Sequence, residues 1–345
     1  MTTSLNDPVR LSDPGDLIAA TGYLLGFQPA DSIVMIGHRG SERNRVGTTL
    51  RADLPPPKYE RALAEQLTHT VSMQDISAVT LVVIGGKSSG RSKRPPPYAR
   101  LISTVTLLLE AEGIALLHAM WVPRIAKGAG WRCYQDRNCG GTLPDPQTSA
   151  VAAASAANGT VTYRSRAELA NQLRPAPDEV LARRAAMLDE RLNGLESGED
   201  PADVAYEPAL ATVREALEAS GRDSLSLTDE FVVRLGMALS NRAVRDHCLT
   251  TALPVDGTQA VAAERLWLDL TRAMPEPERA EPACLLGYAA YMRGDGAFAG
   301  MALEVALDAC PGHLLSALLK RALEAALPPK RLAALATPKQ ADETE

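Results

Sequence analysis

The stretch DPGDLIAATGYLLGFQPADSIVMIG, residues 13–37, predicts a helix, a turn and a buried strand in succession. Asp13 followed by Pro14 is a favourable helix start, because Asp caps the first turn and Pro fits the first helical position. Asp16 lies in that first turn, where a negative charge suits the helix dipole. The apolar run SIVMI, residues 32–36, has the length and composition of a short buried strand.

The same stretch raises a question about its three carboxylates, on Asp13, Asp16 and Asp31. We interpret them as a helix cap, a partner of the helix dipole and a turn residue. The alternative is a functional cluster of carboxylates at one edge of a sheet. That alternative is disfavoured because Asp31 precedes its strand, whereas ligands of open α/β sheets usually bind at the carboxyl ends of strands.

Outward from this stretch, strands alternate with helices, and two polar segments have the composition of hairpin loops. The predicted strands are 32–36, 46–54, 78–86, 114–122 and 130–134, and the predicted helices are 14–25, 58–72 and 97–112. This alternation, combined with two hairpins, predicts a mixed α/β sheet rather than a purely parallel one.

The 345 residues are too many for one ordinary core, so we expect two domains. Helical patterns dominate the second half of the chain. We predict a mixed α/β domain at 1–175, a helical linker at 176–204, an all-helical domain at 205–337 and a disordered tail at 338–345.

One segment of the helical part has the spacing of a repeat. LLGYAAYMRGDGAFAGMALEVALDACP places Leu286 and Gly287, then Ala299, Ala306 and Pro311, at the small-residue intervals of a tetratricopeptide repeat. Small residues allow two antiparallel helices to approach closely, and Pro ends the pair. The segment therefore resembles one such unit, and we expect a protein partner to bind through the C-terminal helices.

The composition excludes several classes of protein. Hydrophobic residues make up 46% of the chain and charged residues 23%, as in soluble globular proteins. The net charge of −6 argues against sequence-independent nucleic-acid binding, which needs a basic face. We expect no secretory signal and no membrane span, because the first residues are polar and no apolar run is long enough. Five scattered cysteines fit a reducing cytoplasm.

The loop after the clearest buried strand is the main candidate for a ligand site. It reads VVIGGKSSGRSKRPPP, residues 82–97. A Gly-rich turn after a strand is able to point backbone N–H groups at phosphate. The candidate ligand residues in this loop are Gly85, Gly86, Lys87, Ser88 and Arg91. It is not a P-loop, because Leu81 stands where Gly is required. The alternative interpretation is a solvated, flexible loop.

Three polar residues outside this loop complete the candidate set. Arg51 and Asp53 end the second predicted strand, and Asp31 precedes the first. Arg51 and Asp53 either pair with each other, face solvent or position a ligand. These patterns identify neither a catalytic residue nor a cofactor.

Cys133 and Cys139 do not form a recognisable metal motif. They are six residues apart, and no second Cys or His pair follows at zinc-finger spacing. A structural zinc needs four good ligands, so we predict no metal site.

The N-terminal block also carries a family resemblance. DPGDLIAATGYLLGFQPADSIVMIG, followed by LRADLPPP and a cysteine-containing segment that leads into an Ala-rich helix, resembles an actinobacterial family of domains of unknown function, family 4192. The resemblance extends to the helical end, with LWLDLTRA and GDGAFAGMALEVAL. It implies no activity and therefore no catalytic residue.

Two functions remain open at this point. The first is an interaction or scaffold protein, which the repeat-like spacing and the lack of a catalytic motif favour. The second is an α/β domain, with or without enzymatic activity, that binds a phosphorylated ligand or nucleotide through the loop from Gly85 to Arg94. The fold class does not decide between them.

Overall fold

The computed structural model describes residues 13–40, 45–86, 95–157, 161–196 and 205–336. Its internal contacts divide the chain into two units, residues 1–169 and 170–345. The tail predicted at 338–345 lies outside the described residues.

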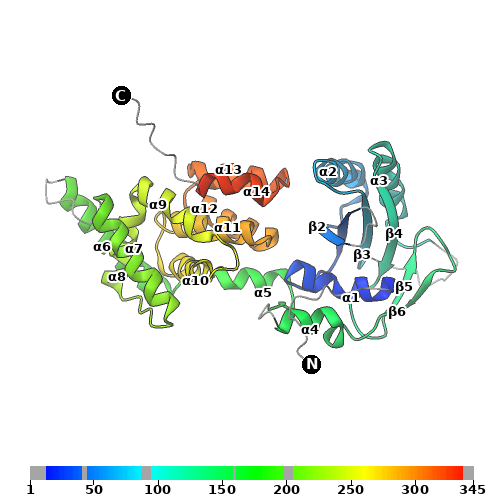
Figure 1. Ribbon diagram of the computed structural model, residues 1–345, viewed down its shortest axis with the longest axis horizontal. Helices are drawn as coiled ribbons and strands as arrows, with labels where there is room; N and C mark the ends of the chain where they lie inside the picture. Colours follow the sequence, from blue (N-terminus) through cyan, green and yellow to red (C-terminus); the bar gives the residue numbers. More distant parts are fainter. Residues whose placement is uncertain (1–12, 41–44, 87–94, 158–160, 197–204, 337–345) are drawn as a thin grey trace. The chain divides into compact units, whose positions relative to one another are not determined.

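The N-terminal unit is a six-stranded mixed sheet with helices on both faces (Figure 1), and the predicted fold class is confirmed. Its strands are β1 (Ser32–Arg39), β2 (Arg45–Asp53), β3 (Ala78–Ile84), β4 (Ala115–Val122), β5 (Gly130–Cys133) and β6 (Gly140–Thr142). Its helices are α1 (Pro14–Leu25), α2 (Glu60–Ser72), α3 (Ala99–Ala111), α4 (Ala150–Ala157) and α5 (Arg166–Ala170), which ends at the boundary. The sequence did not predict β6, because three residues that include two glycines carry no strand signal.

The strand order is β2-β1-β3-β4-β5-β6. β1 is antiparallel to both β2 and β3, so β2 and β3 run in the same direction. β4 is parallel to β3, and β5 and β6 add antiparallel neighbours. The two crossover connections, through α2 and α3, therefore join strands that all point toward the same edge of the sheet.

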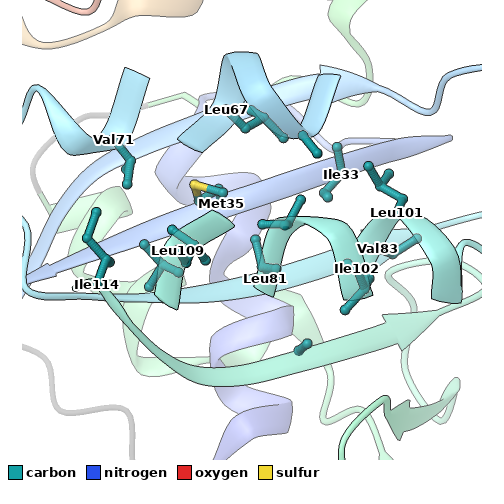
Figure 2. Packing of buried hydrophobic residues seen from close by; sticks show 14 of the residues in the cluster. Ile33, Met35, Leu67, Val71, Leu81, Val83, Leu101, Ile102, Leu109 and Ile114 are labelled. Carbon is teal, nitrogen blue, oxygen red and sulfur yellow. The ribbon is translucent and has the colours of Figure 1, made fainter. Parts of the chain in front are cut away.

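The core lies between this sheet and the pair α2 and α3. Figure 2 shows Ile33 and Met35 of β1 and Leu81 of β3 beneath side chains of the two helices. Val34 and Ile36, the alternate residues of β1, are also fully buried, so the opposite face of the sheet is covered as well. α1 lies on that opposite face (Figure 1).

The ends of α1 form as the sequence predicts. The Asp13 carboxylate accepts a hydrogen bond from the Gly15 amide at 2.6 Å, which satisfies one donor of the first turn. Gly26 ends the helix in the left-handed conformation at φ 75°. The role of Asp13 as a helix cap is confirmed.

The C-terminal unit is helical. Its α-helices are α6 (Asp178–Glu196), α7 (Tyr206–Gly221), α8 (Asp229–Ser240), α9 (Arg242–Cys248), α10 (Thr258–Ala273), α11 (Ala280–Arg293), α12 (Gly296–Ala309), α13 (Leu314–Glu324) and α14 (Pro329–Leu332). α6, which lies in the region predicted as a helical linker, packs on α8 through Leu188, Val233 and Met237. Among the described residues, no helix combines the length and apolar character that crossing a membrane requires.

α11 is the central helix of this unit. Nearly all of its residues are buried, and α8, α9, α10, α12, α13 and α14 all contact it. Gly287 allows the close approach of α12, because a Cβ at this position would lie 2.7 Å from Cγ of Leu303. The sequence predicted this close helix pair from its small residues. The likeness to a tetratricopeptide unit stays a prediction. Because α11 is buried among other helices, it does not line an open groove.

Candidate functional site

One edge of the sheet collects most of the residues that the sequence singled out. The carboxyl ends of β2, β3 and β4 and the first turns of α2 and α3 all lie at this edge. Arg51 and Asp53 arrive with the end of β2, and Gly85 and Gly86 with the end of β3.

Asp31 belongs to the same edge, which the sequence did not predict. β1 is antiparallel to β3, and its first residue, Ser32, pairs with Ile84, the last residue of β3. The start of β1 therefore lies beside the end of β3. The position of Asp31 before its strand is consequently no argument against a place in the site.

The Gly85–Gly86 turn is held between Asp31 and Tyr98. The Gly86 amide donates a hydrogen bond to Oδ1 of Asp31 at 3.2 Å. A Cβ on Gly86 would lie 3.0 Å from the ring of Tyr98. Two of the predicted ligand-binding residues, Asp31 and Gly86, thus form a hydrogen bond with each other. The Gly86 amide therefore already has an acceptor within this chain.

The backbone around this turn is unusual. All four residues, Asp31, Gly85, Gly86 and Tyr98, have positive φ, at 42°, 89°, 79° and 61° respectively. The left-handed conformation is costly for Asp and Tyr, which carry a Cβ. Such outliers persist only where surrounding contacts enforce them, and they concentrate at functional sites.

Gly85 is also fixed by its own peptide groups. Its amide donates to the Val122 carbonyl at 2.9 Å, and its carbonyl accepts from Nε1 of Trp121 at 2.8 Å. The turn is therefore anchored to the end of β4 on both sides of Gly85.

Arg51 and Asp53 form an ion pair, with 2.6 Å between Nη2 and Oδ1. Arg51 also donates from Nε to the Ser32 hydroxyl at 2.9 Å. The Arg51 side chain is 16% exposed and that of Asp53 is 83% exposed. Pairing between the two is observed, Asp53 also faces solvent, and a role in positioning a ligand stays a prediction. The Arg51 guanidinium is held against the start of β1.

An aromatic and cationic group lies at the same edge and was missed by sequence reasoning. The Arg132 guanidinium lies 4.9 Å from the centre of the Trp121 ring. The Tyr134 hydroxyl donates to the Pro97 carbonyl, just before α3. Burial raises the pKa of Tyr134, so its hydroxyl remains a donor at neutral pH. The pairing of β4 with β5 sets Trp121 opposite Arg132 and so creates this group, which no sequence pattern marks.

Glu60 is a second residue that the sequence did not indicate. It is the first residue of α2 and is 9% exposed. Its Oε2 is buried and has no hydrogen-bond partner among the described residues. A buried carboxylate oxygen without a partner is costly, so it retains the capacity to accept a hydrogen bond.

Three predicted residues, Lys87, Ser88 and Arg91, lie outside the described residues. Within the parts of the chain that the structure describes, no group of three or more His, Cys, Asp or Glu side chains is placed to hold a metal ion.

Comparison with known proteins gives one result. A family model described as a domain of unknown function, DUF4192, matches residues 14–330. No curated protein and no solved structure matches the chain. Because the match spans both units, the chain as a whole belongs to the DUF4192 family of domains of unknown function.

Proposed function

We propose that the N-terminal unit binds a small anionic, phosphate-bearing molecule, such as a nucleotide, at the carboxyl edge of β2, β3 and β4, in the cytoplasm. The observation that carries this proposal is the meeting of two helix starts and a cation at one sheet edge. The first turns of α2 and α3 present the positive ends of their dipoles there. Arg132 adds a guanidinium over the ring of Trp121, at the end of β4.

The first turn of α3 is the part of this edge that is best suited to an anion. Tyr98 precedes the helix and provides no side-chain hydrogen bond to its first amides. The Gly86 amide, by contrast, is bonded to Asp31. Backbone N–H groups at a helix start combine with an Arg fork to recognise phosphate oxygens. Tyr98, which is partly exposed, supplies a flat surface at the same edge.

The test is calorimetric titration of the intact protein with ATP and with pyrophosphate. Arg132→Gln removes one charge-assisted interaction, and we expect it to weaken binding at least about tenfold. Arg39→Gln is the matched control, because Arg39 ends β1 at the opposite edge of the sheet. This variant should bind both probes with the affinity of the unmodified protein.

Two results would contradict the proposal. One is the absence of heat with either probe at millimolar concentration. The other is equal weakening by both substitutions, which would indicate a diffuse charge effect rather than a site at the α3 edge.

A second proposal, protein interaction through the helical unit, is favoured by one specific feature. Leu314 and Leu318 are 71% and 51% exposed. They lie four residues apart on α13 and therefore share one face of that helix. Exposed leucines grouped in this way are typical of contact surfaces. Since α11 is enclosed, a partner would contact outer helices such as α13 rather than a groove along α11.

For this second proposal, we expect Leu314→Ser combined with Leu318→Ser to abolish capture of specific partner proteins in quantitative affinity purification. Leu107→Ser is the control, because Leu107 is an equally exposed leucine, 67% accessible, on α3 of the other unit. Identical sets of captured partners for the unmodified protein, the double variant and Leu107→Ser would argue against a contact surface on α13.

A further inference from the structure

The hairpin of β5 and β6 places two cysteines opposite each other. The pairing sets Arg132 against Gly140, so the next pair along the ladder is Cys133 and Cys139. The Cys133 amide donates to the Cys139 carbonyl at 3.0 Å, which continues the ladder to this pair. Directly opposed residues of antiparallel strands project their side chains from the same face of the sheet.

This arrangement is close to the geometry of a disulfide. Opposed residues in antiparallel strands have Cβ atoms about 4.5–5.5 Å apart, and a disulfide needs about 3.5–4.5 Å. Both cysteines are free, and the Cys133 thiol donates a hydrogen bond to Oε1 of Gln135 at 3.7 Å. Only a small closure of the strands therefore separates the reduced pair from a bonded one.

We propose that Cys133 and Cys139 form a reversible disulfide when the protein meets a two-electron oxidant of the peroxide class. The partly exposed Cys139 reacts first: its sulfur attacks hydrogen peroxide, the O–O bond breaks, and a sulfenic acid and one water form. Cys133 then attacks that sulfur. The S–S bond forms, the S–O bond breaks, and the hydroxide leaves as water with the proton of Cys133. Two thiols and one peroxide give one disulfide and two waters.

The surroundings of Cys139 set the pace of this reaction. Burial and the Cys133 thiol, followed by the carboxylates of Asp136 and Asp13, raise the pKa of Cys139. Little thiolate is present at neutral pH, so the oxidation is slow and needs sustained oxidant.

The bond would stiffen a segment that reaches the candidate ligand site. Tyr134 follows Cys133 directly; its amide donates to the Ala119 carbonyl and its hydroxyl to the Pro97 carbonyl. A cross-link at Cys133 restrains the hairpin that carries Tyr134, and with it the residues just before α3. This inference does not depend on the proposed function, because the disulfide is detected without any ligand.

Trypsin provides a direct test, because it cuts after Arg132 and Arg137 and so places the two cysteines in separate peptides, 133–137 and 138–164. The intact protein is treated with hydrogen peroxide at pH 8, its remaining thiols are blocked, and the digest is analysed by mass spectrometry. We expect one cross-linked pair of these peptides, about 2 Da lighter than their sum, which a dithiol reductant separates. The count of free thiols should fall from five by two.

Cys310→Ser is the matched control and should leave the cross-link unchanged, whereas Cys139→Ser should abolish it. The oxidised protein should also unfold at a higher urea concentration than the reduced protein, because the cross-link restricts the unfolded chain. Cys139 found as sulfinic acid while Cys133 remains a thiol, or a bond between Cys139 and a second molecule, would overturn the proposal.

Discussion

Gly85→Ala is expected to lower the free energy of unfolding of the N-terminal unit by about 3 kcal/mol or more. The left-handed conformation at φ 89° costs a residue with a Cβ about 1–2 kcal/mol. The new Cβ would also lie 2.3 Å from Oδ1 and 3.0 Å from Cα of Asp31. The Cα cannot swing away as a side-chain end does, and forced packing adds about 1–3 kcal/mol.

The hydrogen bonds of Gly85 prevent relief of this clash. Its amide and carbonyl are bound to Val122 and Trp121, so the turn moves only by breaking those bonds as well. Urea unfolding of the full chain measures the loss, and hydrogen exchange of the β3 amides locates it in the N-terminal unit.

Gly113→Ala separates strain from packing. Gly113 follows α3 with φ 71°, and a Cβ there would meet nothing within 4 Å. We expect only the conformational cost of about 1–2 kcal/mol. Equal losses for the two variants would show that Asp31 does not constrain Gly85, and the described turn geometry would then be wrong.

Arg184→Met is expected to lower the free energy of unfolding of the helical unit by about 3 kcal/mol. Arg184 is 7% exposed and joins α6 to two other parts of the unit. It donates to the Asp229 carboxylate at 2.7 Å, to the Ala273 carbonyl at 2.7 Å and to the Leu227 carbonyl at 3.2 Å. Methionine fills a similar volume but donates no hydrogen bond. The three acceptors therefore stay in the folded protein without the donor that Arg184 provided.

Arg183→Met is the matched control for this prediction. Arg183 binds the same Asp229 carboxylate, but its side chain is 56% exposed. Exposed pairs contribute little to stability because water screens them, so we expect a much smaller loss than for Arg184. Urea unfolding of both variants, followed by circular dichroism of the helices, compares them. A loss for Arg183→Met as large as that for Arg184→Met would contradict the assignment of the effect to burial.

Much of the fold was predictable because its signals are local. The cap at Asp13, the helix end at Gly26 and the apolar run of β3 each depend on a few neighbouring residues. Boundaries were predictable to within a few residues wherever Pro or Gly interrupts a periodic segment. β6 was missed because its strand conformation comes from pairing with β5 and not from its own residues.

The candidate site was predictable only in part. Gly85 and Gly86 stand out because two glycines after a buried strand mark a special backbone, and both have positive φ. Arg132 and Glu60 were missed because nothing near them in the sequence marks them. Arg132 gains its place from the register of β4 and β5, and Glu60 from the burial of the first turn of α2.

By itself, the sequence determined most of the helices and strands, the mixed α/β class of the first half and the helical nature of the second, because capping, periodicity and turn chemistry act over a few residues. Only the tertiary structure decided which residues meet. The antiparallel placement of β1 between β2 and β3 turned the start of one strand into a neighbour of the ends of two others. It thereby brought Asp31 to the Gly86 amide, because strand direction and order are set by long-range packing that no local pattern encodes.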